Sequence, residues 1–225
     1  MTSEARARLR GLYAVTPEMQ DTARLVTMVE ECIAGGARLV QYRAKHAGAA
    51  LALEQARRIA AACRAGGEPM IVNDSVELAL EAGADGVHLG REDSDPRRAR
   101  AALPGKIVGV SCYADPHLAR DAALAGADYV AIGSMFASTT KPHAVRASLE
   151  ALALARSASG LPVAAIGGID VGNAARAVAA GADMVAVISA LFDAASVRAA
   201  ARAFACLFDA TPTVSSHVRT QPRAL

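Results

Sequence analysis

Short runs of β-branched and other apolar residues alternate along the chain with longer stretches rich in Ala, Leu, Arg and Glu. The eight apolar runs lie at residues 12–15, 39–42, 70–72, 86–89, 107–110, 129–132, 163–166 and 184–188. Continuous apolar runs of this length are typical of buried parallel strands. The stretches between them, for example 21–34, 49–65 and 115–125, have the composition of helices. The alternation therefore predicts a parallel sheet covered by helices.

A short repeat divides these units into pairs. Gly-Ala followed by Asp or Arg occurs at 36–38, 83–85, 126–128 and 181–183, each time directly before an even-numbered run. Gly suits the end of a helix because it adopts the left-handed conformation without a Cβ clash. Four double units predict an α/β fold made of a single (βα)8 TIM barrel. An open doubly wound sheet is the less favoured alternative, because the repeat shows no change of direction.

The repeat also sets the expected boundaries. We expect the barrel to occupy residues 11–210, after an N-terminal extension at 1–10. The segment 211–225 is rich in Thr, Ser, Pro and Arg and is expected to be a mobile tail.

Charge and hydropathy exclude several classes of protein. Lys and Arg number 24 and Asp and Glu 22, so the net charge of +2 gives no basic footprint for nucleic acid. No apolar run approaches the ~20 residues of a membrane helix, and the N-terminus lacks the apolar core of a signal peptide. The four widely spaced cysteines suggest free thiols in a reducing cytoplasm.

Polar residues gather where the predicted strands end, which is the active-site end of a TIM barrel. Cations, amides, small hydroxyls and glycines at these positions suit the binding of phosphate groups. These residues are Gln41, Arg43, Lys45, Asn73, Ser111, Ser138, Thr140, Lys141, Gly168 and Ser189. The alternatives are structural: a solvated strand end at 41–45 and a tight turn at Gly167-Gly168.

Two carboxylates follow neighbouring strands, Asp74 after the third and Asp93 after the fourth. Proteins commonly hold Mg²⁺ with one or two carboxylates together with substrate oxygens. The pair therefore favours a Mg²⁺ site beside the phosphate-binding residues. The alternative for Asp74 is helix capping, because it directly precedes a predicted helix. His88, inside the fourth strand, is expected to be a hydrogen-bonded barrel residue rather than a catalyst.

Taken together in order, these motifs resemble the thiamine-phosphate synthase family, also called thiamin-phosphate pyrophosphorylase. The resemblance spans residues 12 to 190. The stretches that carry it are Leu12-Tyr13-Ala14-Val15-Thr16, Gln41-Tyr42-Arg43-Ala44-Lys45, Asn73-Asp74, Gly83-Ala84-Asp85-Gly86-Val87-His88-Leu89-Gly90 with Arg91-Glu92-Asp93, Val108-Gly109-Val110-Ser111, Gly126-Ala127-Asp128-Tyr129, Phe136-Ala137-Ser138-Thr139-Thr140-Lys141, Ala165-Ile166-Gly167-Gly168-Ile169 and Val187-Ile188-Ser189-Ala190.

The resemblance implies a transferase with two small-molecule substrates and Mg²⁺. A hydroxymethylpyrimidine diphosphate loses pyrophosphate by a dissociative displacement, and a thiazole phosphate nitrogen takes up its methylene to give thiamine phosphate. By the same resemblance, Gln41 and Ser111 contact the pyrimidine, and the diphosphate is held by Arg43, Lys45, Asn73 and Lys141. Asp74 and Asp93 bind Mg²⁺, and the thiazole phosphate is held by Ser138, Thr140, Gly168, Ile188 and Ser189. Catalysis is assigned to Arg43, Lys45, Lys141 and Ser111.

Three places depart from the family pattern. Ala137-Ser138 stands where Pro-Thr is common, Arg91 where Gln is usual, and Cys112-Tyr113 where Thr-His is common. These departures bear on substrate affinity and loop order more than on reaction type. The competing interpretations are a related thiazole tautomerase and a catalytically silent ligand-binding homologue. The sequence leaves a homo-oligomer open.

Overall fold

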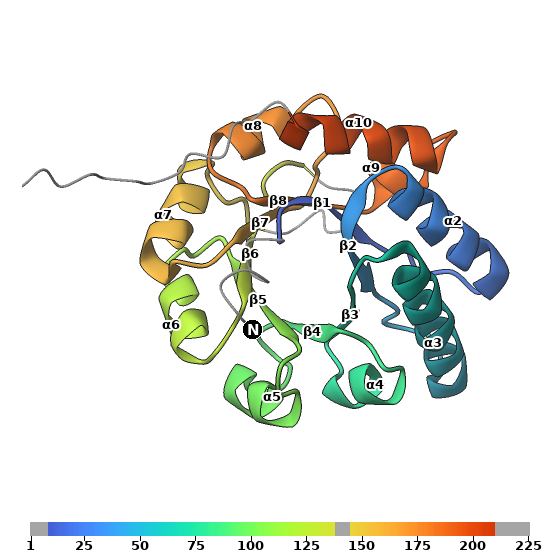
Figure 1. The fold of residues 1–225 in the computed structure, drawn as a ribbon. Helices are drawn as coiled ribbons and strands as arrows, with labels where there is room; N and C mark the ends of the chain where they lie inside the picture. Colours follow the sequence, from blue (N-terminus) through green and yellow to red (C-terminus); the bar gives the residue numbers. More distant parts are fainter. Residues whose placement is uncertain (1–8, 138–144, 210–225) are drawn as a thin grey trace, which may run out of the picture.

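The computed structural model describes residues 9–137 and 145–209. Its strands close into a barrel in sequence order, and each strand pairs in parallel with both neighbours (Figure 1). The strands are β1 (Gly11–Val15), β2 (Ala37–Tyr42), β3 (Met70–Asn73), β4 (Gly86–Leu89), β5 (Ile107–Tyr113), β6 (Tyr129–Ile132), β7 (Val163–Ile166) and β8 (Met184–Val187). The helices around them are α2 (Thr22–Ala34), α3 (Ala49–Gly66), α4 (Val76–Glu81), α5 (Pro96–Ala102), α6 (Leu118–Leu124), α7 (Glu150–Ser159), α8 (Ala174–Ala179), α9 (Ser189–Phe192) and α10 (Val197–Asp209).

The closed barrel confirms the predicted fold class, and the differences are at the ends of elements. Helix α6 begins at Leu118 rather than at 115, because Asp115 accepts a hydrogen bond from the His117 backbone N–H at 2.9 Å in a turn before the helix. Strand β5 continues to Tyr113, past an irregularity in its pairing with β6. The predicted extension is described only from Leu9, and the predicted tail lies outside the described residues.

The repeated Gly-Ala-Asp motif links neighbouring strands by hydrogen bonds near their N-terminal ends. The four motif glycines all have positive φ, as the sequence predicts. Asp85, Asp128 and Asp183 each accept a hydrogen bond from a backbone N–H of the preceding strand, at 2.9–3.0 Å. Arg38 replaces Asp in the first repeat and instead forms an ion pair with Glu68 at 3.0 Å. The repeat is thus a device for strand pairing at the end of the barrel opposite the predicted site.

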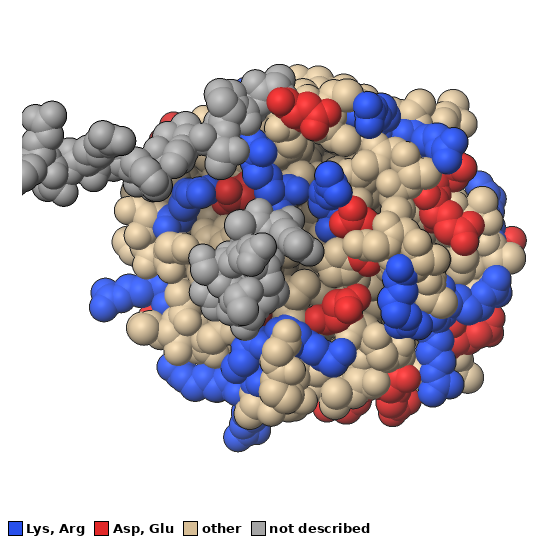
Figure 2. Space-filling model, viewed as in Figure 1, with Lys and Arg blue, Asp and Glu red and all other residues tan. Residues whose placement is uncertain are grey.

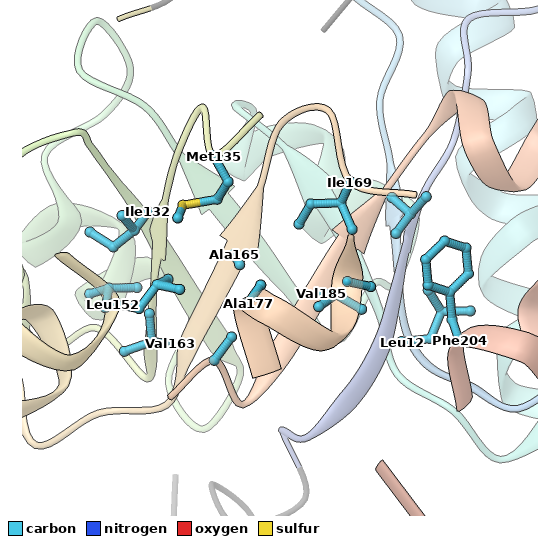
Figure 3. Close-up of a cluster of buried hydrophobic side chains, with 14 of the residues drawn as sticks. Leu12, Ile132, Met135, Leu152, Val163, Ala165, Ile169, Ala177, Val185 and Phe204 are labelled. Atoms are coloured by element: carbon cyan, nitrogen blue, oxygen red, sulfur yellow. The ribbon is translucent and has the colours of Figure 1, made fainter. Parts of the chain in front are cut away.

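Apolar side chains pack in a layer between the strands and the surrounding helices. Figure 3 shows part of this layer, in which Val163 of β7 lies beside Leu152 of α7, and Leu12 of β1 beside Phe204 of α10. A third cluster fills the barrel itself and includes the rings of Tyr13 and Tyr129. The barrel interior is therefore a packed core that carries polar atoms.

The surface carries both signs of charge. On the face shown in Figure 2, Lys and Arg are interspersed with Asp and Glu around the rim. Within the described residues, no helix is long and apolar enough to cross a membrane. All four cysteines are free thiols.

Candidate active site

A cavity of about 340 Å³ opens at the C-terminal ends of the strands. Seven of the residues predicted from sequence line it together: Gln41, Arg43, Asn73, Ser111, Gly168, Ile188 and Ser189. They lie near or just after the C-terminal ends of β2, β3, β5, β7 and β8, so residues from distant parts of the chain converge on one space. A larger hollow of about 890 Å³ lies at the opposite end of the barrel and contains none of the predicted site residues.

A chain of hydrogen bonds crosses the floor of this cavity. The Gln41 amide Nε2–H donates to the Tyr13 hydroxyl, which lies 2.8 Å from the Tyr129 hydroxyl. The Tyr129 oxygen is 2.8 Å from His88 Nδ1, and His88 Nε2 is 2.8 Å from the Ser111 hydroxyl. Burial raises the pKa of Tyr13 and Tyr129, so both phenols keep their protons at neutral pH. His88 is thus the hydrogen-bonded barrel residue that the sequence predicts.

Three predicted residues, Lys45, Asp74 and Asp93, do not line the cavity themselves but follow the strands that end beside it. Lys45 Nζ lies 3.4 Å from the Asp74 carboxylate, and Asp74 lies close enough to Asp93 to shift the pKa of that carboxyl. The Gly90 backbone N–H donates to Asp93 at 2.6 Å. Burial raises the pKa of Asp93, and the nearby Asp74 carboxylate raises it further. The structure therefore brings together the two carboxylates predicted to bind Mg²⁺.

The backbone at Asp74 argues against a capping role. The α4 cap is Ser75, whose hydroxyl accepts the Leu78 backbone N–H at 3.0 Å. Asp74 has φ of 69°, in the left-handed region that favours glycine. Its N–H donates to the His88 carbonyl at 2.8 Å, which fixes this conformation at the cavity edge. Strained backbone of this kind clusters at functional sites.

Gly168 forms the opposite wall. A Cβ at this position would lie 2.2 Å from the Ala137 carbonyl oxygen, so a side chain is excluded. The Gly167 carbonyl accepts the Phe136 N–H at 2.9 Å, and the Gly168 carbonyl accepts the Asn173 side-chain amide at 2.9 Å. The two glycines thus serve the close packing of the loops after β6 and β7, and their backbone faces the cavity.

Three predicted residues, Ser138, Thr140 and Lys141, lie outside the described residues. Ala137, directly before them, lines the cavity. Cys112 is buried, and burial raises the pKa of its thiol to about 12, so it is protonated at neutral pH.

Several lining residues have no ligand-binding role predicted from the sequence, among them Tyr13, Tyr113 and Asp170. Tyr13 and Val15 alternate along β1 and both reach the cavity, so the period of two was a usable signal. Tyr113 depends on the extension and irregular pairing of β5, for which the sequence gives no signal.

Known proteins resemble this chain in both sequence and fold. Residues 12–191 match the family described as thiamine monophosphate synthase. The chain belongs to this family. The thiamine-phosphate synthase of Aromatoleum aromaticum is 55% identical over 204 residues, 90% of this chain and 98% of that protein. The thiamine-phosphate synthase of Methylobacillus flagellatus is 51% identical over 210 residues, 93% of this chain and 100% of that protein.

A solved structure agrees with these relatives. Thiamine phosphate pyrophosphorylase from Pyrococcus furiosus has a TM-score of 0.82 and 34% identity, covering 91% of this chain and 98% of that one. Membership of the thiamine monophosphate synthase family confirms the predicted resemblance and the predicted transferase class. It favours the synthase over the tautomerase and the silent homologue.

Proposed function

We propose that this chain joins a hydroxymethylpyrimidine diphosphate to a thiazole phosphate, with Mg²⁺, and releases pyrophosphate. The observation that carries the proposal is the convergence on one cavity of the seven predicted substrate-binding residues named above. A cavity with an amide, a guanidinium, hydroxyls and open glycine backbone can bind both a heterocycle and phosphate groups. The four free thiols support a reducing compartment such as the cytoplasm.

The pyrimidine diphosphate would lie between β2 and β5. Gln41 and Ser111 would contact the ring, while Arg43, Lys45, Asn73 and Lys141 would hold the diphosphate. Arg43 is fixed by a hydrogen bond from its backbone N–H to the Thr16 hydroxyl at 2.9 Å. The cations would offset the negative charge that develops on pyrophosphate as it leaves.

Asp74 and Asp93 fit a divalent cation. The Asp74 carboxylate raises the pKa of Asp93, and the repulsion between two neighbouring negative charges is relieved by a cation between them or by a proton on one of them. Lys45 neutralises this pair only in part, from 3.4 Å and with a half-exposed side chain. When bound, Mg²⁺ supplies positive charge to the diphosphate oxygens and stabilises the leaving pyrophosphate.

The thiazole phosphate would lie against the loops after β7 and β8. Gly168, Ile188 and Ser189 would hold its phosphate, Gly168 and Ile188 partly through their backbone, together with Ser138 and Thr140. The thiazole nitrogen carries its own lone pair, so the reaction needs no general base. His88 supports this view, because both its ring nitrogens are already hydrogen-bonded, to Tyr129 and Ser111.

The test is a direct assay. Purified protein is mixed with the pyrimidine diphosphate, the thiazole phosphate and Mg²⁺, and thiamine phosphate is followed by chromatography. We expect product that EDTA abolishes and excess Mg²⁺ restores. Folded protein that gives no product, but isomerises a thiazole carboxylate phosphate, would support the tautomerase instead. Binding of the substrates without either reaction would support the silent homologue.

A further inference from the structure

Gln41 and Ser111 stand at the two ends of the buried hydrogen-bond chain that runs through Tyr13, Tyr129 and His88. The three linking side chains are at most 7% exposed, so water has little access to these bonds. The rings are also packed together: Tyr13 meets Tyr129 edge-on at 5.9 Å between centroids, and His88 stacks on Tyr129 at 5.5 Å. This hydrogen-bond chain is therefore a preformed part of the barrel core.

Glycine at position 109 makes room for this arrangement. Gly109 of β5 lies opposite Tyr129 of β6 in the strand register. A Cβ at Gly109 would lie 2.1 Å from the Tyr129 ring, a distance that no packing tolerates. The absence of a side chain at Gly109 therefore leaves room for the Tyr129 ring, whose hydroxyl contacts both Tyr13 and His88.

Because each of the three linking side chains has only one hydrogen to donate, the directions of the bonds depend on one another. Both phenols are protonated, and each has one hydrogen to donate. A neutral imidazole has one donor and one acceptor nitrogen. With Gln41 as the donor to Tyr13 and His88 in its neutral form, every hydroxyl hydrogen finds an acceptor only if Tyr13 donates to Tyr129 and Tyr129 donates to His88 Nδ1. His88 Nε2 then donates to Ser111, which leaves the Ser111 hydroxyl hydrogen to point into the cavity.

Gln41 and Ser111 consequently present opposite hydrogen-bonding groups to a ligand. With its Nε2 engaged by Tyr13, the Gln41 amide offers its carbonyl oxygen as an acceptor. Ser111 offers a donor. If the Gln41 amide turned over, every bond along the chain would reverse, and Ser111 would become the acceptor.

We propose that Tyr13, Tyr129 and His88 are positioning residues that couple the hydrogen-bonding character of Gln41 to that of Ser111. The cavity then selects a ring with a donor at one end and an acceptor at the other. An aminopyrimidine edge, with an exocyclic amino group beside a ring nitrogen, has this pattern. The inference rests on the proposed function for the identity of the ring, whereas the coupling itself is a property of the protein.

The coupling is measured with a double-mutant cycle. Affinity for the pyrimidine diphosphate is determined by calorimetry, which needs no turnover, for Gln41→Ala, Ser111→Ala and the double variant. Without the Gln41 amide, the bonds of the hydrogen-bond chain can run in either direction. Part of the affinity that the Ser111 hydroxyl contributes is then lost as well. We expect the double variant to lose about tenfold less affinity than the product of the single losses.

The same cycle is repeated in the Tyr129→Phe background, which interrupts the chain at its centre. In that background we expect the affinity losses of Gln41→Ala and Ser111→Ala to multiply, so that the double variant shows no coupling. Tyr42→Phe is the matched control, because Tyr42 is equally buried and donates to Gln55 at 2.9 Å, away from this chain. If Tyr129→Phe fails to fold, Tyr13→Phe interrupts the chain at a second point.

Nitrogen NMR of His88 gives a readout that loss of stability alone does not move. We expect the Nε2-protonated tautomer in the wild type with pyrimidine bound, and an average of two tautomers in Tyr129→Phe. Independent losses in the wild type, or equal coupling in Tyr129→Phe, would overturn the proposal. Lack of thiamine phosphate formation by the wild type would overturn the proposed function, while the affinities would still decide the coupling.

Discussion

The guanidinium of Arg91 lies over the ring of Tyr113, 4.7 Å from its centroid, and the Tyr113 hydroxyl accepts the Arg91 backbone N–H at 2.6 Å. Arg91 follows β4 and Tyr113 ends β5, so the contact ties two strand ends together. Both are positions at which we expect a departure from the family pattern, and in the structure they contact each other. The same loop after β4 carries Asp93, so Tyr113 braces the loop that holds a candidate metal ligand.

Tyr113→Phe should therefore weaken the response to Mg²⁺. The change removes the acceptor of the Arg91 N–H, and residues that orient a metal ligand commonly affect metal affinity by about tenfold or more. We expect the Mg²⁺ concentration for half-maximal rate to rise about tenfold, with little change in KM for the thiazole phosphate. Arg91→Gln keeps the backbone bond and loses only the contact with the ring, about 0.5–1 kcal/mol, so its effect should be smaller.

Asp74→Ala and Asp93→Ala should each abolish Mg²⁺-dependent turnover while the barrel stays folded. Each change removes one carboxylate of the proposed pair. Asp95→Ala is the control, because Asp95 lies two residues beyond Asp93 but accepts the Arg97 N–H at 2.7 Å as the α5 cap. It should cost about 1 kcal/mol of stability and leave the Mg²⁺ response unchanged. Full activity of either site variant would remove the metal assignment.

The response to Mg²⁺ should also depend on pH. Burial, with the Asp74 carboxylate, raises the pKa of Asp93, so this group takes up a proton at a higher pH than an ordinary aspartate. A protonated carboxyl no longer binds the cation. As the pH falls, the Mg²⁺ concentration for half-maximal rate should therefore begin to rise at a higher pH than it would for an aspartate with an ordinary pKa. A titration of the rate at several pH values measures this, and a flat profile down to pH 4 would contradict it.

The strands could be predicted from sequence because each is short, apolar and buried on both faces. The 86–89, 129–132 and 163–166 runs coincide with β4, β6 and β7. The convergence of Gln41, Asn73 and Ser111 also followed from one rule, that all strands of a parallel barrel end on the same side.

The rest of the site depends on register and backbone detail that the sequence pattern does not contain. The meeting of Tyr13 with Tyr129, 116 residues apart, requires the stagger of a closed barrel and the space above Gly109. Tyr113 reaches the cavity only through the local irregularity of β5. Such contacts are decided by packing between distant strands.

Ser189→Ala should raise KM for the thiazole phosphate more than KM for the pyrimidine diphosphate. Ser189 begins α9, the short helix after β8, on the side of the cavity where we place the thiazole phosphate. Loss of one hydrogen bond to a charged group costs about 1.5–3 kcal/mol, which corresponds to roughly ten- to a hundredfold in binding. Equal changes in both KM values would count against this placement.

Two aspartates of the strand-pairing repeat differ in burial and should therefore differ in their contribution to stability. Asp128 is fully buried, accepts the Val108 N–H at 3.0 Å and forms an ion pair with Arg100. Asp183 holds the equivalent place, but its side chain is 16% exposed. Asp128→Ala removes the acceptor of the buried Val108 N–H and the carboxylate partner of the part-buried Arg100, so it should cost about 3 kcal/mol of unfolding free energy.

Asp183→Ala is the matched comparison and should cost only about 1 kcal/mol, because water can solvate the groups that it leaves behind. Urea denaturation measures both losses. Neither change should alter KM for the two substrates, since both residues lie at the barrel end opposite the cavity. Equal losses in the two variants would mean that burial of the carboxylate does not decide its contribution to stability.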